Sequence, residues 1–149
     1  MKLKLLQVFF VVLLFVCTGC KDKTGVSSQT TNAEDNINNR PTIIAYYFHR
    51  TMRCPSCIAI EANAADAIEN NFKEQLANER LVWLPVNLGN SGGEAFEKEF
   101  DITISTLVLA KIQNGKYTEY KKLEKVWELL GDTEAFSQYI VNEINKYLQ

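Results

Sequence analysis

The chain has 149 residues, 46% of them hydrophobic and 23% charged, and its formal net charge is −2 at pH 7. This composition is ordinary for a soluble domain and excludes collagen-like, fully disordered and polytopic membrane proteins. The near-neutral charge argues against nucleic acid as a partner, because nucleic-acid-binding proteins carry a broad basic surface. The count of four cysteines is too low for a small domain held together mainly by disulfides.

The first residues of the chain predict a bacterial lipoprotein signal peptide, 1–19. Two lysines precede an apolar run at 5–16, which is shorter than the ~20 residues that a membrane-spanning helix needs. The run ends in CTGC, which resembles a lipobox, although Cys17 stands where that motif usually has an aliphatic residue. Cleavage would then occur before Cys20, whose thiol would carry lipid. An uncleaved N-terminal anchor is the alternative, and both interpretations place the rest of the chain outside the cytoplasm.

Residues 20–40 are predicted to be the lipidated cysteine and a flexible linker. The stretch after Cys20, KDKTGVSSQTTNAEDNINNR, has few apolar residues and no regular period, so it cannot bury enough surface to fold. Its root-mean-square reach would be ~25 Å. The chain would therefore be tethered to a membrane that faces the periplasm or the cell surface, and residues 41–149 would form its folded domain.

The folded domain is predicted to follow the order β-α-β-α-β-β-α. Its first helix begins at the cysteines and runs to about residue 78, because apolar residues recur every four positions over this stretch. Pro85 indicates that the second strand lies at an edge, and Asn114-Gly115 predicts a hairpin turn. Thr133 is the expected N-cap of the last helix. The expected strands are 42–48, 81–88, 102–112 and 116–123, and the second expected helix is 92–100.

This order predicts an α/β domain with the minimal thioredoxin-like fold, in which helices flank a central four-stranded sheet. The sequence Cys54-Pro-Ser-Cys57 lies between the first strand and the first helix, where that fold keeps its active site. Cys54 would sit at the helix N-terminus, where unpaired N–H groups and the helix dipole stabilise a thiolate. We therefore expect Cys54 to attack a partner disulfide and the more buried Cys57 to resolve the mixed disulfide. Pro55 suits the first helical position.

Three basic residues before the cysteines, His49, Arg50 and Arg53, are candidates for stabilising the Cys54 thiolate. The alternatives are a hydrogen-bonded loop histidine and two ordinary surface arginines. Glu61, one helical turn after Cys57, is either an aid to proton transfer or part of a solvated helix face. Trp127 is expected to pack in the core.

Two other functions are compatible with the same cysteines. Cys54 and Cys57, with His49 as a third candidate ligand, could contribute to a metal site, although a structural zinc site needs four ligands. The pair could also form an inert disulfide in a non-catalytic interaction module, although a bond across two intervening residues closes a very small loop.

The stretches FHRTMRCPSCIAIE, FDITISTLVLAK and LEKVWELLGDTEAF resemble secreted thioredoxin-like proteins described as nitrophenyl compound nitroreductase subunit, ArsF family. The resemblance covers residues 41–149 and implies redox work. In thioredoxins a cis-proline and a threonine open the third strand and face the two cysteines. Ser105 and Thr106 hold these positions here, so the resemblance implies a substrate-facing loop. With serine in place of proline we expect a trans peptide bond, because a non-proline cis bond costs ~3–4 kcal/mol.

These features together predict a membrane-tethered, extracytoplasmic thiol–disulfide oxidoreductase or electron-transfer module. It would need no bound cofactor besides the Cys54–Cys57 disulfide. Its partners would be a protein thiol or disulfide as substrate, a redox partner that resets the pair, and the membrane through the lipid anchor. Thioredoxins also bury an acid in the strand before the motif, and residues 43–48 contain none.

Overall fold

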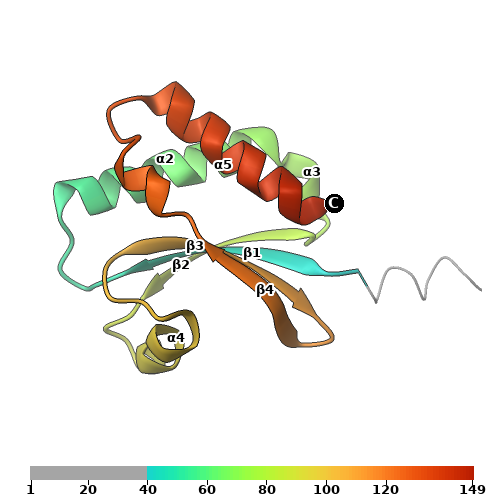
Figure 1. The fold of residues 1–149 in the computed structure, drawn as a ribbon, viewed down its shortest axis with the longest axis horizontal. Helices are drawn as coiled ribbons and strands as arrows, with labels where there is room; N and C mark the ends of the chain where they lie inside the picture. The colour runs from blue at the N-terminus through green and yellow to red at the C-terminus, as the bar shows by residue number, and fades with distance from the viewer. Residues whose placement is uncertain (1–39) are drawn as a thin grey trace, which may run out of the picture. The chain divides into compact units, whose positions relative to one another are not determined.

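The computed structural model describes residues 40–149, which form one sheet with helices on both of its faces (Figure 1). The predicted signal peptide, Cys20 and the linker up to residue 39 lie outside the described residues. The strands are β1 (Thr42–His49), β2 (Leu81–Asn87), β3 (Thr106–Gln113) and β4 (Lys116–Lys122). The helices are α2 (Pro55–Asn71), α3 (Lys73–Ala77), α4 (Gly93–Phe100), the 3₁₀ helix η1 (Glu124–Trp127) and α5 (Thr133–Leu148).

The sheet has the strand order β2-β1-β3-β4. β1 runs parallel to β2 and antiparallel to β3, and β4 pairs antiparallel with β3. Pro85 lies on the edge strand β2, as predicted, where its missing N–H removes no bond from a central ladder. α2 and α5 cover one face of the sheet and α4 covers the other (Figure 1). This is the predicted α/β arrangement, the minimal thioredoxin-like fold.

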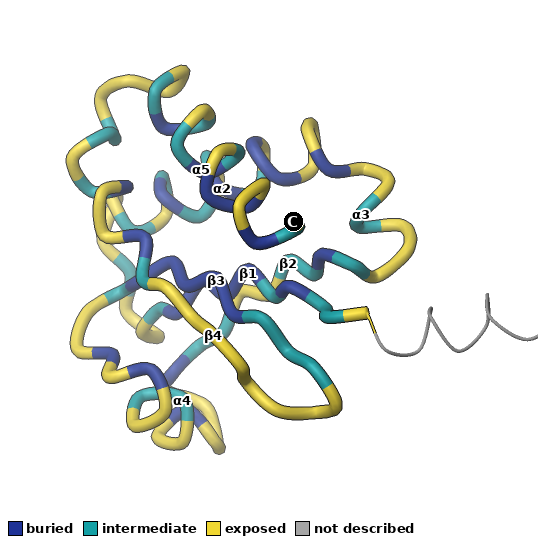
Figure 2. Tube along the Cα trace, turned by 45° about the vertical axis from the view of Figure 1, so that its right-hand side comes forward, coloured by how far each residue is buried: buried dark blue, intermediate teal, exposed yellow. Residues whose placement is uncertain are grey.

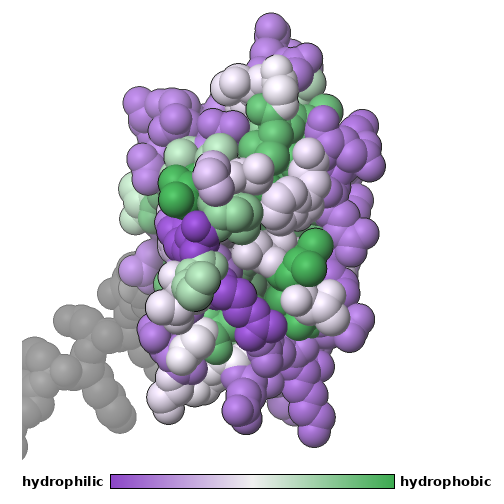
Figure 3. All heavy atoms as spheres, turned by 90° about the vertical axis from the view of Figure 1, so that its left-hand side faces the viewer, coloured by the Kyte–Doolittle hydropathy of each residue, from purple (hydrophilic) through white to green (hydrophobic). Residues whose placement is uncertain are grey.

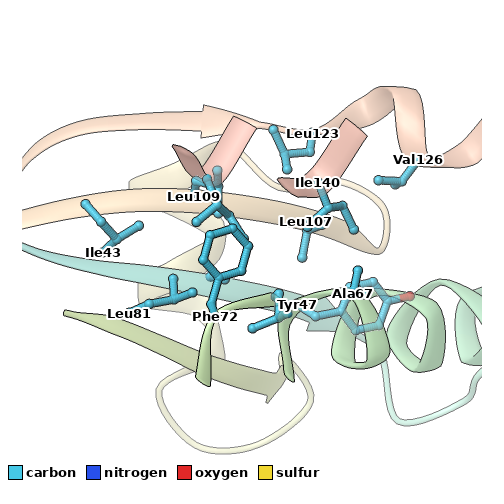
Figure 4. Close-up of a cluster of buried hydrophobic side chains, with 14 of the residues drawn as sticks. Ile43, Tyr47, Ala67, Phe72, Leu81, Leu107, Leu109, Leu123, Val126 and Ile140 are labelled. Atoms are coloured by element: carbon cyan, nitrogen blue, oxygen red, sulfur yellow. The ribbon is translucent and has the colours of Figure 1, made fainter. Parts of the chain in front are cut away.

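Alternation along β1 divides its side chains between two cores. Ile43, Ala45 and Tyr47 are buried on the face covered by α2 and α5, together with residues of β3 and η1 (Figure 4). Tyr46 and Phe48 are buried on the opposite face, in a second core that includes residues of α4. Trp127 packs against the first core, as predicted.

The β3–β4 hairpin confirms the predicted turn. Asn114 and Gly115 both have positive φ, of 53° and 73°, which favours Asn-Gly at these two positions. A bulge interrupts the register between Lys111 and Ile112. β4 is exposed along most of its length at the edge of the sheet (Figure 2).

Three boundaries differ from the sequence prediction. The first helix does not continue to residue 78, because Phe72 leaves the helical conformation with φ −127° and separates α2 from α3. The third strand begins at Thr106 rather than at residue 102. The last helix is capped by Asp132, whose carboxylate accepts a hydrogen bond from the Ala135 N–H at 3.0 Å. The predicted cap, Thr133, is instead the first helical residue.

α4 depends on a close backbone approach at its start. A Cβ atom at Gly93 would overlap the Leu88 carbonyl, so a side chain there requires the backbone to shift.

Within residues 40–149, no helix combines the length and the apolar character needed to span a bilayer.

Candidate functional site

Cys54 lies at the start of α2 and acts as its N-cap. Its backbone is extended, with φ −80° and ψ 159°, and Pro55 follows as the first helical residue. The Cys54 Sγ accepts a hydrogen bond from the Cys57 N–H at 3.1 Å, and the Cys54 carbonyl accepts one from the Ile58 N–H at 3.1 Å. The sulfur therefore occupies the position where a helix N-terminus binds an anion.

Cys54 and Cys57 form a disulfide across the first turn of α2, with their Cα atoms 5.1 Å apart. Cys54 is exposed and Cys57 is half-buried, as the sequence predicted. A partner can therefore approach Cys54 directly, whereas the helix partly shields Cys57.

Tyr47 contacts the helical turn that carries Cys57, and the sequence alone did not point to it. Its side chain is buried and reaches from β1 to α2, where its hydroxyl donates a hydrogen bond to the Cys57 carbonyl at 2.7 Å (Figure 4). Burial raises the pKa of Tyr47, while Arg53 and a hydrogen bond with Ser105 act in the opposite direction. A phenol with a pKa above the ordinary value of 10.0 is protonated at neutral pH, so the Tyr47 hydroxyl is a donor there.

Arg53 pairs with Glu61 beside the disulfide. The ion pair connects the loop before Cys54 with the second turn of α2, and the Arg53 guanidinium lies 5.9 Å from the centroid of the Tyr47 ring. The structure therefore brings together two sequence candidates, Arg53 and Glu61, through an ion pair that their spacing did not predict. The Arg53 Nε is buried and has no hydrogen-bond partner among the residues that the structure describes.

His49 and Arg50 have partners of their own. The His49 Nδ1 lies 3.0 Å from the Arg50 carbonyl oxygen, and the Arg50 guanidinium pairs with Glu97 of α4. In the described part of the chain, no group of three or more His, Cys, Asp or Glu side chains is arranged to hold a metal ion.

Ser105 and Thr106 differ in where their hydroxyls lie. Ser105 is half-buried just before β3, and its interaction with the Tyr47 hydroxyl acts to lower the pKa of Tyr47. Thr106 is buried, and its hydroxyl donates to the Ile104 carbonyl at 2.7 Å, within its own turn. No cis peptide bond occurs between residues 40 and 149, which confirms the trans bond expected at Ser105.

Three exposed apolar side chains occur in the segments that form the site. Met52, Ile58 and Ile104 are 91%, 53% and 61% exposed. Met52 precedes Cys54 by two residues, Ile58 follows Cys57, and Ile104 precedes Ser105. Figure 3 views the end of the molecule where β1 leads into α2, and apolar areas there interrupt a largely polar surface.

No protein-family profile matches this chain, and no curated protein matches it either. Among solved structures, it is similar to a chain of the complex between ferredoxin:thioredoxin reductase and thioredoxin f2, at a TM-score of 0.41 and 16% identity over 74% of this chain and 90% of that one. It is also similar to thioredoxin f from spinach chloroplast, at a TM-score of 0.38 and 15% identity over 67% of this chain and 73% of that one. The zinc-bound form of human ERp44 matches at 0.45 and 21% identity over 76% of this chain and 29% of that one. Similarity at this level identifies no substrate or partner for this chain.

Proposed function

We propose that this protein is a thiol–disulfide oxidoreductase or electron-transfer module that uses Cys54 as nucleophile and Cys57 as resolving cysteine. The observation that carries the proposal is the position of the exposed Cys54 Sγ, which caps α2 and accepts the Cys57 N–H. A thiolate at this position is stabilised by the helix N-terminus, so Cys54 is the better nucleophile at neutral pH. The half-buried Cys57 lies within bonding distance as the second thiol.

The reaction transfers two electrons in two exchange steps. The Cys54 thiolate attacks a partner disulfide, forms a Cys54–partner disulfide and releases one partner thiolate. Cys57 then loses its proton and attacks the Cys54 Sγ, which reforms the Cys54–Cys57 disulfide and releases the second partner thiolate. The pair is oxidised and the partner is reduced, and the same steps in reverse oxidise a partner dithiol.

The substrate we propose is a disulfide or dithiol in another protein. The exposed Met52, Ile58 and Ile104 beside the site support a partner with an apolar segment next to its cysteines. A second redox partner would reset the pair after each turnover, and no bound cofactor is required for these steps.

We further propose that this protein acts as an extracytoplasmic lipoprotein of the ArsF-type group, held at the membrane by lipid on Cys20. The apolar run and the CTGC sequence support this anchor. Labelled palmitate should be incorporated into the full chain and not into Cys20→Ser. Equal labelling of the two chains, or none in either, would contradict the anchor.

The direct test of the redox function is to trap a mixed disulfide with Cys57→Ser. This variant keeps the nucleophile but cannot resolve, so it should accumulate a partner protein bonded through Cys54, identified by mass after digestion. Cys54→Ser is the matched control and should trap no partner at this pair, because of the two cysteines of the pair it keeps only the half-buried Cys57. Failure of Cys57→Ser to form any mixed disulfide, even with a small reporter disulfide, would contradict the proposal.

A further inference from the structure

The Tyr47 hydroxyl connects three segments that meet at the disulfide. It belongs to β1 and donates to the Cys57 carbonyl in the first turn of α2, and it interacts with Ser105, which precedes β3 and acts to lower the pKa of Tyr47. Its ring lies beneath the Arg53 guanidinium, which is itself paired with Glu61 of α2. Of these contacts, the hydrogen bond from Tyr47 to the Cys57 carbonyl joins the start of α2 directly to the sheet.

The neighbouring tyrosine provides an internal comparison. Tyr46 is also buried in β1, and its hydroxyl also has one close partner, the Tyr117 hydroxyl at 3.0 Å. Alternation along the strand places Tyr46 on the opposite face of the sheet, in the core with α4. The two residues thus match in type, burial and strand, and differ in whether they contact the turn that carries Cys57.

We propose that Tyr47 is a positioning residue for the resolving cysteine, and that its hydroxyl holds the first turn of α2 in the conformation that favours the Cys54–Cys57 disulfide. The biological meaning of this inference rests on the proposed function. The physical basis is proximity: a disulfide forms more favourably when its two thiols are held in bonding geometry, because less freedom is then lost on closure. The Cys54 cap holds the N–H of Cys57 and the Tyr47 hydroxyl holds its carbonyl, so the two hydrogen bonds together restrict the backbone of the resolving cysteine.

The test compares Tyr47→Phe with Tyr46→Phe in the full chain. Each change removes one hydroxyl and keeps the ring, so both variants should fold. The proteins are equilibrated with buffers of reduced and oxidised glutathione, the free thiols are alkylated, and the peptide with Cys54 and Cys57 is quantified by mass. This measurement distinguishes the pair from Cys17 and Cys20, which lie elsewhere in the sequence.

For Tyr47→Phe we expect the ratio of dithiol to disulfide to rise about three- to tenfold at a fixed glutathione ratio, which is the range for losing one ordering hydrogen bond. Tyr46→Phe should stay within about twofold of the wild type. A Tyr47→Phe ratio within twofold of the wild type would overturn the inference. So would an equal rise in both variants, because it would indicate a general loss of stability.

Ser105→Ala gives an independent variant that leaves the Tyr47 ring in place. If Ser105 acts through the phenol, its effect on the ratio should be smaller than that of Tyr47→Phe and should vanish in the double variant. Equal effects of Ser105→Ala with and without the Tyr47 hydroxyl would overturn the connection between the two residues. The equilibrium needs only the disulfide and glutathione, so it remains measurable even if Cys57→Ser traps no partner. Failure of the proposed function and failure of this inference can therefore be told apart.

Discussion

The two long helices on the same face of the sheet begin in different ways. α5 is capped by Asp132, whose carboxylate accepts the Ala135 N–H, and Glu134 adds a second acid in its first turn. α2 is capped by the Cys54 Sγ, and its first turn contains no acid. In both helices a side chain accepts a hydrogen bond from an N–H group of the first turn, but only in α5 is that side chain a negatively charged carboxylate.

Under the proposed function, this difference separates a helix start that serves stability from one that serves chemistry. Carboxylates at the start of α5 compensate the positive end of the helix dipole. At the start of α2 that positive end remains uncompensated, so it stabilises a thiolate when the disulfide is reduced. The following predictions change one of these two helices at a time.

Cys54→Ser should have the largest effect, because it removes the nucleophile. Exchange through the Cys54–Cys57 pair should be lost completely, measured as reduction of a small disulfide in a background where Cys17 and Cys20 are also serine. Under reducing conditions the free energy of unfolding should stay the same or rise by up to about 1 kcal/mol, because serine is a preferred N-cap. A loss of more than about 1 kcal/mol in urea unfolding would contradict the view that the sulfur is kept for its reactivity.

Glu143→Gln tests the buried acid in the body of α5. Burial raises the pKa of Glu143, but hydrogen bonds at 2.8 Å from Lys121 and Lys146 outweigh burial, so the net shift is downward. A lowered pKa adds stability that is present above the unfolded-state value of ~4.3 and is lost as pH falls through the folded-state pKa. We expect the variant to lose about 1–2 kcal/mol at pH 7. The difference from wild type should shrink below about pH 4, and urea unfolding at both pH values measures it. A difference that grows on acidification would contradict this sign.

Asp132→Ala should remove the cap of α5 and cost about 1 kcal/mol in the free energy of unfolding. Because this cap lies at a different helix start, the dithiol-to-disulfide ratio of the cysteine pair should not change. Thr133→Ala is the control and should cost less, since Thr133 is the first helical residue rather than the cap. A larger loss of stability for Thr133→Ala than for Asp132→Ala would contradict Asp132 as the cap and would favour Thr133, the cap predicted from the sequence.

Ser56→Glu should have the smallest effect, because it makes the first turn of α2 resemble that of α5. Ser56 is exposed, so the change leaves the core intact. The added charge should stabilise the helix by about 0.3–1 kcal/mol and slow the alkylation of reduced Cys54 at neutral pH, since it opposes the thiolate. Ser56→Gln controls for side-chain size. Faster alkylation of the Glu variant than of the Gln variant would contradict the role of the helix N-terminus.

The order of the elements could be predicted because each strand and helix has its own pattern, but the boundaries depend on tertiary structure. Ile68, Phe72 and Leu76 keep a four-residue spacing, although the backbone leaves the helix at Phe72. The β-branched residues of 102–105 suggested a strand, but these residues precede β3 and Thr106 closes a turn there.

The cysteine pair of the site could be predicted from local sequence, whereas its surroundings could not. Cys54 and Cys57 are recognisable from their spacing at the start of a helix. Arg53 and Glu61 meet only in the folded chain, where an ion pair joins the loop before Cys54 to the second turn of α2. Tyr47 shares a strand face with Ile43 and Ala45, which indicates burial, and a buried phenol needs a hydrogen-bond partner. The sequence therefore indicated that Tyr47 needs a partner. It could not indicate that the partner is the backbone carbonyl of Cys57 in α2.

The most direct test of the redox function is the pH dependence of alkylation at reduced Cys54. The full chain is reduced, reacted with iodoacetamide from pH 4 to 10, and followed by mass for the peptides that carry Cys54 and Cys57. We predict that the rate at Cys54 rises at a pH below ~8.5, the ordinary thiol value, and that Cys54 reacts faster than Cys57 at neutral pH. An inflection at or above ~8.5, with Cys57 reacting as fast as Cys54, would contradict the assignment of Cys54 as the nucleophile.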